Sequence, residues 1–190
     1  MTSVPNVAIV PSTLDLLGVE MAIAGMPDRG YRIRRAFQEM DGFTIGGLPV
    51  SYVLIDCPPS LNLLTINALV AADAVLVPLQ CEFFALEGLS QLLQTIEQIR
   101  TTLNPRLSIQ GVVMTMFDKR NSLSEQVLQD VRQEMGDLVY ETVIPRNVRL
   151  SEAPSYGKPA LLYDLKCAGS QAYLRLATEV IRRERRLVAA

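Results

Sequence analysis

Five short apolar runs, rich in β-branched residues, are separated by longer stretches with helical periodicity, and this alternation most constrains the fold. The runs are nearly continuous rather than alternating with polar residues, which is typical of strands covered on both faces. Strands that alternate with helices in this way predict an α/β fold, with a mostly parallel sheet flanked by helices. The runs are Val7–Val10, Val53–Ile55, Ala74–Val77, Ile109–Met114 and Thr142–Ile144.

Helical periodicity fills most of the intervals between these runs. From Leu86 to Leu103, leucine and isoleucine recur every three or four residues, which predicts an amphipathic helix. Ser122 begins a capping-box pattern ahead of another helix, and Ser170 can cap a last one. Since the chain is long enough to bury a full core, we expect residues 1–190 to form a single domain.

The composition excludes several classes of protein. Apolar residues make up 49% of the chain and charged residues 20%, which excludes intrinsic disorder. The net charge is −2, so binding to nucleic acid would need a local basic patch. The absence of histidine excludes a His/Cys metal site. We expect Cys57, Cys81 and Cys167 to be small buried residues in a reducing cytosol, since no histidine could activate Cys57 as a nucleophile.

Two segments could be mistaken for membrane contacts. The apolar stretch 61–79 contains two asparagines, an aspartate and a proline, so it predicts a buried helix followed by a buried strand. The basic segment 181–190 has too few apolar residues for an amphipathic membrane anchor, and we interpret it as a solvated helix end. Polar residues follow Met1 where a signal peptide would be apolar. We therefore expect a soluble chain with no membrane partner.

The segment YVLIDCPPSLNLLTINAL, residues 52–69, places a carboxylate at the end of a predicted strand. Asp56 follows the run Val53–Ile55, and Pro58 and Pro59 then prevent continuation into sheet or helix. Ligands of α/β sheets bind at the carboxyl ends of strands, where an aspartate can hold Mg²⁺ on nucleotide phosphates. The alternative is an aspartate that only accepts hydrogen bonds from the first turn of the next helix. The residues alone leave both interpretations open.

Several longer segments together resemble one family. Residues 52–69 are similar to the Walker B and switch II region of the ParA/Soj chromosome-partitioning ATPases, in the deviant-Walker ParA/MinD superfamily. The similarity continues through VLVPLQCEFFALEGLSQLLQTIEQIR and LNPRLSIQGVVMTMFDKRNSLSEQV to TVIPRNVRLSEAPSYGKP. The last motif is typical of the chromosomal ParA type, and it disfavours a superfamily member with another cargo. The resemblance covers residues 50–184, and more loosely VAIVPSTLDLLGVEMAIA before them.

The resemblance implies a fold and a nucleotide site. The fold is a three-layer P-loop NTPase-like α/β domain of the AAA_31 or CbiA type, of which this chain would be the C-terminal portion. Asp56 would be the Walker B acid, which reaches Mg²⁺ through water. Switch II, which senses the γ-phosphate of ATP, would include Pro59, Ser60 and Asn67. The residues that would border the adenine and ribose are Met116, Pro145, Arg146 and Asn147.

The resemblance also implies partners. In the intact family, ATP closes two protomers into a homodimer that binds DNA non-specifically, and a ParB-like protein stimulates hydrolysis and release. Arg120 and Arg149 correspond to family arginines that contact DNA; the alternative for Arg146 and Arg149 is that they only order their own loop. About four phosphate contacts would give a slope of log K against log salt of roughly −3.6. The implied location is the cytoplasm, on the nucleoid, in chromosome or plasmid partitioning.

Two family motifs do not occur in this sequence. Family members carry a glycine-rich Walker A loop of the type KGGxGKTT and a later DxDPQ-like motif. The Gly-Lys pair at 157–158 is followed by Pro159 and lacks the glycine five residues earlier. That loop supplies the N–H groups and lysines that hold phosphates, so we expect weak or no binding of ATP and Mg²⁺ and negligible hydrolysis. We also expect an unpaired sheet edge where the Walker A strand would lie.

Two hypotheses follow from this departure. The first is a partition ATPase whose N-terminal part is missing from the chain, through a misplaced start codon, a split or decayed gene, or deliberate shortening. The second is a non-catalytic remnant that still binds DNA or a ParB-like protein. The sequence does not choose between them.

Overall fold

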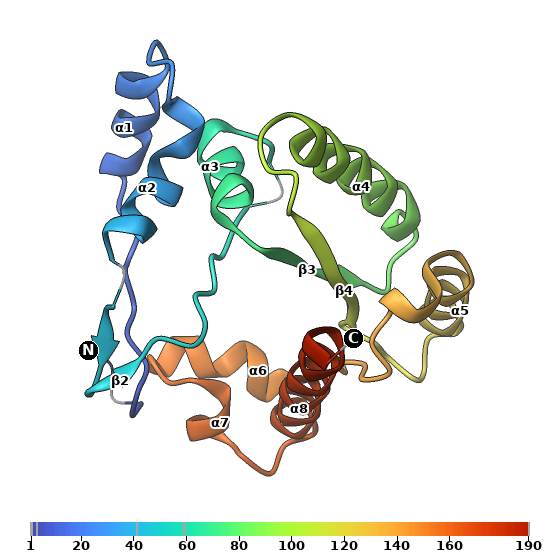
Figure 1. The fold of residues 1–190 in the computed structure, drawn as a ribbon. Coiled ribbons are helices and arrows are strands. Elements are labelled where there is room, and N and C mark those ends of the chain that lie inside the picture. The colour runs from blue at the N-terminus through green and yellow to red at the C-terminus, as the bar shows by residue number, and fades with distance from the viewer. Residues whose placement is uncertain (1, 3, 41, 59, 190) are drawn as a thin grey trace. The chain divides into compact units, whose positions relative to one another are not determined.

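The computed structural model describes residues 2, 4–40, 42–58 and 60–189. These residues divide into two compact units, one of Met1–Ala74 with Ile96–Ser108 and one of Val75–Thr95 with Ile109–Ala190. Figure 1 shows their helices and strands, which together make an α/β protein as predicted. Among the helices described, none has both the length and the apolar character needed to cross a lipid bilayer.

Two paired strands form the sheet of the second unit. β3 (Ala74–Gln80) lies beside β4 (Ser108–Thr115). The strands are parallel, because the Ser108 amide donates to the Asp73 carbonyl at the start of the pair and the Cys81 amide donates to the Thr115 carbonyl at its end. The predictions of strands at Ala74–Val77 and Ile109–Met114 are therefore confirmed.

The predicted strand Thr142–Ile144 lies along the other edge of β4 without being a regular strand. It is held by isolated parallel bridges, Val112 with Val139 and Phe117 with Pro145. Between them, the Ile144 amide donates to the Met114 carbonyl over 2.9 Å. The segment thus acts as a third, irregular strand position.

β4 is buried on both faces, as its apolar run predicts. Val112 and Met114 point into a core shared with β3, α4 (Ala85–Thr102) and α5 (Ser122–Met135). Val113 points the opposite way, into a core with Tyr140 and the helix α8 (Ala168–Ala189). Gly111 interrupts the run because a Cβ there would lie 2.5 Å from the Tyr140 ring. Helices therefore cover both faces of β4, whereas β3 is buried on one face only: Leu76, on its other face, is 40% exposed.

Short helices connect the remaining parts of the second unit. They are η2 (Gly136–Leu138), α6 (Val148–Glu152), η3 (Ala153–Tyr156) and α7 (Ala160–Tyr163). The predicted caps are displaced by one residue in α5 and by three in α8. Asn121, not Ser122, caps α5 by accepting from the Leu123 amide. Ser170 lies inside the first turn of α8, where its hydroxyl donates to the Ala160 carbonyl over 3.1 Å.

The first unit is built from three α-helices and a hairpin among its described residues. The helices are α1 (Asp15–Ile23), α2 (Arg32–Glu39) and α3 (Leu63–Ala71), with the 3-10 turn η1 (Arg29–Tyr31) before α2. The hairpin pairs β1 (Thr44–Ile45) with β2 (Leu48–Pro49) in antiparallel fashion. Gly46 and Gly47 form its turn, with φ values of 60° and 81° that suit glycine.

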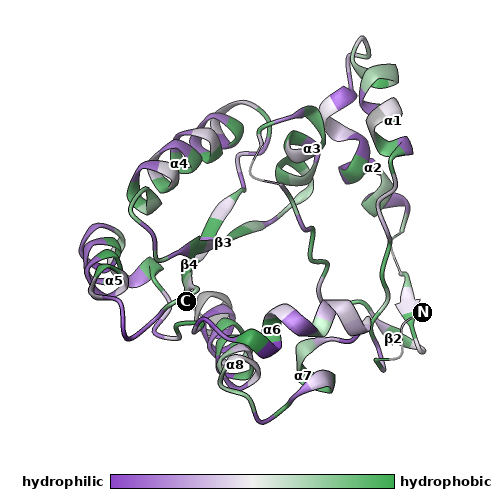
Figure 2. Ribbon diagram, turned by 180° about the vertical axis from the view of Figure 1, so that it is seen from behind, coloured by the Kyte–Doolittle hydropathy of each residue, from purple (hydrophilic) through white to green (hydrophobic). Residues whose placement is uncertain are grey.

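Two predicted strands are wrong: neither Val7–Val10 nor Val53–Ile55 is a strand. Both segments are irregular, and most of their apolar side chains are exposed, including Val10 at 92% and Leu54 at 90%, while Ile55 is half-buried. Figure 2 shows the segment between β2 and α3 as a largely hydrophobic trace. An extended run becomes a strand only when neighbouring backbone groups pair with it, and no described segment pairs with either run in a sheet.

Candidate functional site

The ends of two neighbouring backbone segments bring the predicted adenine residues together. The Phe117 amide donates to the Ile144 carbonyl over 3.1 Å, and the Arg146 amide donates to the Phe117 carbonyl over 2.9 Å. Met116 therefore lies next to Pro145 and Arg146. Its φ of 55° is left-handed, which is uncommon for a residue with a side chain and marks a sharp change of direction after β4.

Asn147 completes this set but has a structural task of its own. Its side-chain oxygen accepts a hydrogen bond from the Arg149 amide over 2.9 Å and so caps α6. The cap uses only the Oδ1 atom of Asn147 and does not involve the two N–H donors on its Nδ2. The nucleotide role of these four residues stays a prediction.

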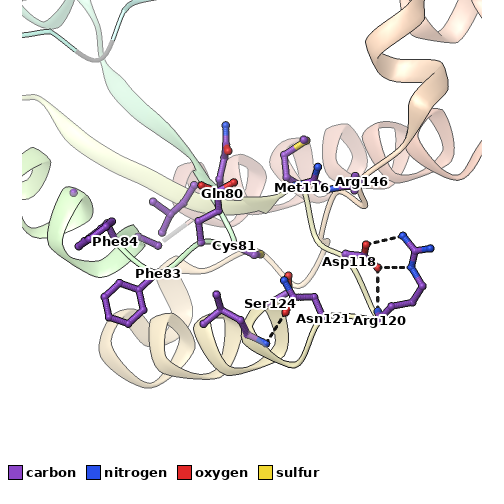
Figure 3. A pocket seen from close by; sticks show the side chains of 15 residues that line it. Gln80, Cys81, Phe83, Phe84, Met116, Asp118, Arg120, Asn121, Ser124 and Arg146 are labelled. Carbon is purple, nitrogen blue, oxygen red and sulfur yellow. Dashed lines mark hydrogen bonds and ion pairs between the residues drawn. The ribbon is translucent and has the colours of Figure 1, made fainter.

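An open hollow of about 890 Å³ lies beside these segment ends. Figure 3 shows Met116, Asp118 and Arg146 on one side of it, with Gln80 and Cys81 from the end of β3 on the other. The turn before α4 adds Phe83 and Phe84, whose exposed rings meet edge to face with centroids 5.1 Å apart. Sequence reasoning missed this aromatic pair, although two adjacent phenylalanines between a predicted strand and a predicted helix were a visible signal.

Arg120 lies on the rim of this hollow, paired with a carboxylate of its own loop. Its Nε and Nη2 atoms donate to the two oxygens of Asp118 over 3.0 and 2.8 Å, while 88% of its side chain is exposed (Figure 3). Hydrogen bonds from the Arg120 side chain and amide, helped by the charges of Arg120 and Arg146, lower the pKa of the Asp118 carboxyl to about 2. Asp118 is therefore ionised at any physiological pH.

Arg149, the other predicted DNA residue, also lies among carboxylates. Its Nη1 donates to Glu152 over 2.9 Å, and its Nε lies 3.6 Å from Asp164. The Tyr163 hydroxyl donates to the same Glu152 oxygen over 3.1 Å. Hydrogen bonding to Glu152 and the charge of that group raise the pKa of Arg149 above its ordinary value.

Asp56 lies on the irregular, exposed segment that precedes α3, rather than at the end of a strand. The prediction that Cys57 is buried is wrong, because this residue is exposed, although desolvation and then the Asp56 charge raise the pKa of its thiol. The described residues contain no group of three acidic or cysteine side chains able to hold a metal. A lone carboxylate fits Mg²⁺ only where phosphates and water supply the other ligands, as is usual for Mg²⁺ on a nucleotide.

The predicted switch II residues lie on α3 and the segment before it. Pro59 lies outside the described residues, and Ser60 is exposed with its carbonyl accepting from the Thr65 hydroxyl. Asn67 is only 2% exposed: its Oδ1 accepts from the Arg32 amide, and its Nδ2 donates to the carbonyls of Arg29 and Leu63. Asn67 thus ties α3 to η1 and α2, and its nucleotide role stays a prediction.

Comparison with known proteins places this geometry in a family. The AAA_31 family model, described as an AAA domain, matches residues 1–109. The chromosome partitioning protein ParA of Caulobacter vibrioides is 65% identical over 184 residues, covering 97% of this chain and 67% of that protein. The sporulation initiation inhibitor protein Soj of Bacillus subtilis is 49% identical, over 94% of this chain and 68% of its own length.

Solved structures agree with the fold. Cobyrinic acid a,c-diamide synthase from Mycobacterium smegmatis, with bound ADP and magnesium, matches 92% of this chain and 62% of its own at a TM-score of 0.73 and 35% identity. The cell division ATPase MinD of Pyrococcus furiosus matches 80% of this chain at a TM-score of 0.63 and 20% identity, which supports the fold alone. This chain spans about two-thirds of the length of its curated relatives. It belongs to the ParA/Soj family of chromosome-partitioning ATPases.

Proposed function

We propose that this chain contributes to chromosome or plasmid partitioning by binding DNA phosphates without reading sequence. The observation that carries the proposal is the pair of exposed guanidiniums, Arg120 on the loop after β4 and Arg149 in α6, which follow two adjacent parallel segments. Exposed Lys119 adjoins Arg120, exposed Arg146 precedes α6, and exposed Lys158 follows η3. Cationic side chains on neighbouring loops suit phosphate contacts, which fix position but do not specify bases.

DNA retention across a salt series tests this proposal. We expect binding to weaken steeply between 50 and 200 mM salt, and Arg120→Ala with Arg149→Ala to weaken it and to reduce the slope of log K against log salt by about 2. Arg100→Ala with Arg106→Ala is the matched control, since it removes two arginines from elsewhere in the chain. Equal binding by the two double variants would refute the role of Arg120 and Arg149.

For the nucleotide, we propose that Met116 with Pro145, Arg146 and Asn147 borders the adenine and ribose. Their adjacency supports this placement, and so does the 35% identical neighbour solved with ADP and magnesium. Asp56 would orient a water ligand of Mg²⁺, and Ser60 would belong to switch II. Bound Mg²⁺ would neutralise phosphate charge. A second copy of the chain and a ParB-like protein would be the partners of the intact protein.

Nucleotide binding can be measured with a fluorescent ATP analogue in the presence of Mg²⁺. Because the sequence contains no KGGxGKTT loop, we expect weak binding and no measurable phosphate release. Arg146→Ala should weaken that binding further, whereas Arg106→Ala should not. Tight binding that is insensitive to Arg146→Ala would show that the adenine lies elsewhere.

The second candidate is a non-catalytic remnant that would bind DNA or a ParB-like protein. It predicts DNA retention that ATP does not change. The roughly 250 bases upstream of the Met1 codon separate the two candidates. An in-frame KGGxGKT segment there would support the partition ATPase, and stop codons or unrelated sequence would support the remnant.

A further inference from the structure

Each arginine proposed to contact DNA is already occupied by a carboxylate close to it in sequence. Asp118 holds Arg120 through both of its oxygens, two residues away. Glu152 holds Arg149 from one helical turn away, over 2.9 Å. A guanidinium offers a planar fork of N–H groups, and a carboxylate and a phosphate bind that fork in the same two-oxygen geometry. The N–H groups that would contact DNA are thus engaged within the chain.

The carboxylates have hydrogen bonds that do not depend on the arginine side chains. Asp118 Oδ1 also accepts the Arg120 backbone amide over 3.0 Å. Glu152 accepts the Tyr163 hydroxyl over 3.1 Å. Asp164, the second carboxylate near Arg149, accepts the amides of Lys166 and Cys167, each over 3.1 Å. An arginine that leaves therefore vacates a carboxylate that stays close and can take it back.

The charges and the exposure of these side chains keep the free-energy difference small when an arginine exchanges its carboxylate for a phosphate. Arg120 with Asp118 carries no net charge, and Arg149 with Glu152 and Asp164 carries a net charge of −1. The side chains of Arg120 and Arg149 are 88% and 54% exposed, so either can swing toward a ligand without disturbing the core. Ion pairs at such exposed positions are weak and open readily.

We propose that Asp118 and Glu152 act as internal competitors of DNA, so that they set the affinity of Arg120 and Arg149 for phosphate. This inference rests on the proposed DNA-binding function. It identifies two acidic residues as negative determinants of a cationic surface. Their removal should tighten DNA binding, whereas residues that merely support the loops would weaken it when replaced.

The test uses Asp118→Asn and Glu152→Gln, each of which keeps an oxygen that can accept the backbone amide or the tyrosine hydroxyl. We expect each to bind DNA about two- to fivefold more tightly, the range that one exposed ion pair spans. Each freed arginine should also steepen the slope of log K against log salt by up to about 0.9. The combined variant should show both gains together.

Glu97→Gln is the matched control. Glu97 pairs with Arg100 one helical turn away at an equally exposed position, so the substitution removes the same charge and the same kind of ion pair. We expect Glu97→Gln to change DNA affinity by less than Glu152→Gln. Glu152→Gln should not tighten DNA binding in an Arg149→Ala background, because the guanidinium that Glu152 would otherwise hold is absent.

The possible outcomes separate the inference from the function on which it rests. If Arg120→Ala with Arg149→Ala leaves DNA binding unchanged, the DNA-binding proposal itself fails. If that double variant weakens binding while Asp118→Asn and Glu152→Gln match Glu97→Gln or bind less tightly, the competitor role alone is overturned. Persistence of the Glu152→Gln gain in the Arg149→Ala background would also overturn it.

Discussion

Two apolar runs that both predict a strand differ in structure: one is a buried strand and the other is an exposed, irregular segment. Ile109–Met114 lies in β4, where Val112 and Met114 are 0% exposed. Val53–Ile55 lies on an irregular segment, where Val53 and Leu54 are 56% and 90% exposed. Hydrophobicity is therefore shared by the two runs, and it does not explain the difference.

The difference lies in what each run has beside it. β4 pairs with β3 on one edge and with the segment around Val139 to Pro145 on the other, and helices cover both of its faces. No described segment pairs with the Val53–Ile55 run in a sheet. A central strand is thus a property of its neighbours, because its backbone groups and both faces must be satisfied by other segments.

The largest effect that tests this comparison is on stability. Met114→Ala should lower the free energy of unfolding by about 2–5 kcal/mol, since it leaves a cavity in a packed core. Leu54→Ala, the matched change in the exposed run, should stay within about 0.5 kcal/mol. Urea unfolding followed by circular dichroism measures both. A comparable loss in Leu54→Ala would mean that Val53–Ile55 is buried in solution, and the comparison would be broken.

Thiol chemistry gives a second contrast between the same regions. Burial, and then the charge of Glu125, raise the pKa of Cys81 to about 11 from an ordinary value of 9.0. This shift lowers the thiolate fraction at pH 8 about a hundredfold. Cys57 is exposed, although its pKa is also raised. We expect iodoacetamide to label Cys57 well before Cys81, as mass spectrometry of the peptides would show; equal rates would contradict the burial of Cys81.

The sequence predicts most of the second unit because its signals are local. The β4 run and the leucine periodicity that follows Glu82 each describe one element, and both are confirmed as β4 and α4. The cap of α5 was misplaced by one residue because Asn121 and Ser122 are both good capping residues, and the backbone decides between them.

The candidate site could be predicted only in part. Adjacency of Met116 and Pro145 follows from the ends of parallel segments meeting at one edge, which the strand pattern already implies. The carboxylates on Arg120 and Arg149 could not be foreseen, since charged residues two or three positions apart pair only when the turn brings them together. The engagement of Asn67 with residues 35 and 38 positions away is equally invisible in the sequence.

The smallest predicted effect concerns a buried carboxylate that holds the second unit together. Burial alone would raise the pKa of Glu179, but hydrogen bonds from the Glu141 and Thr142 amides and from Arg183 outweigh it and lower the pKa below its ordinary 4.5. A lowered pKa adds stability that is present above pH 4.5 and is lost as the pH falls through the folded value. The unfolding free energy of Glu179→Gln should therefore fall less between pH 5 and pH 3 than that of the exposed control Glu134→Gln. An unchanged decline would show that Glu179 does not titrate with unfolding, and that the anchoring of the Glu141–Thr142 backbone to α8 does not depend on its charge.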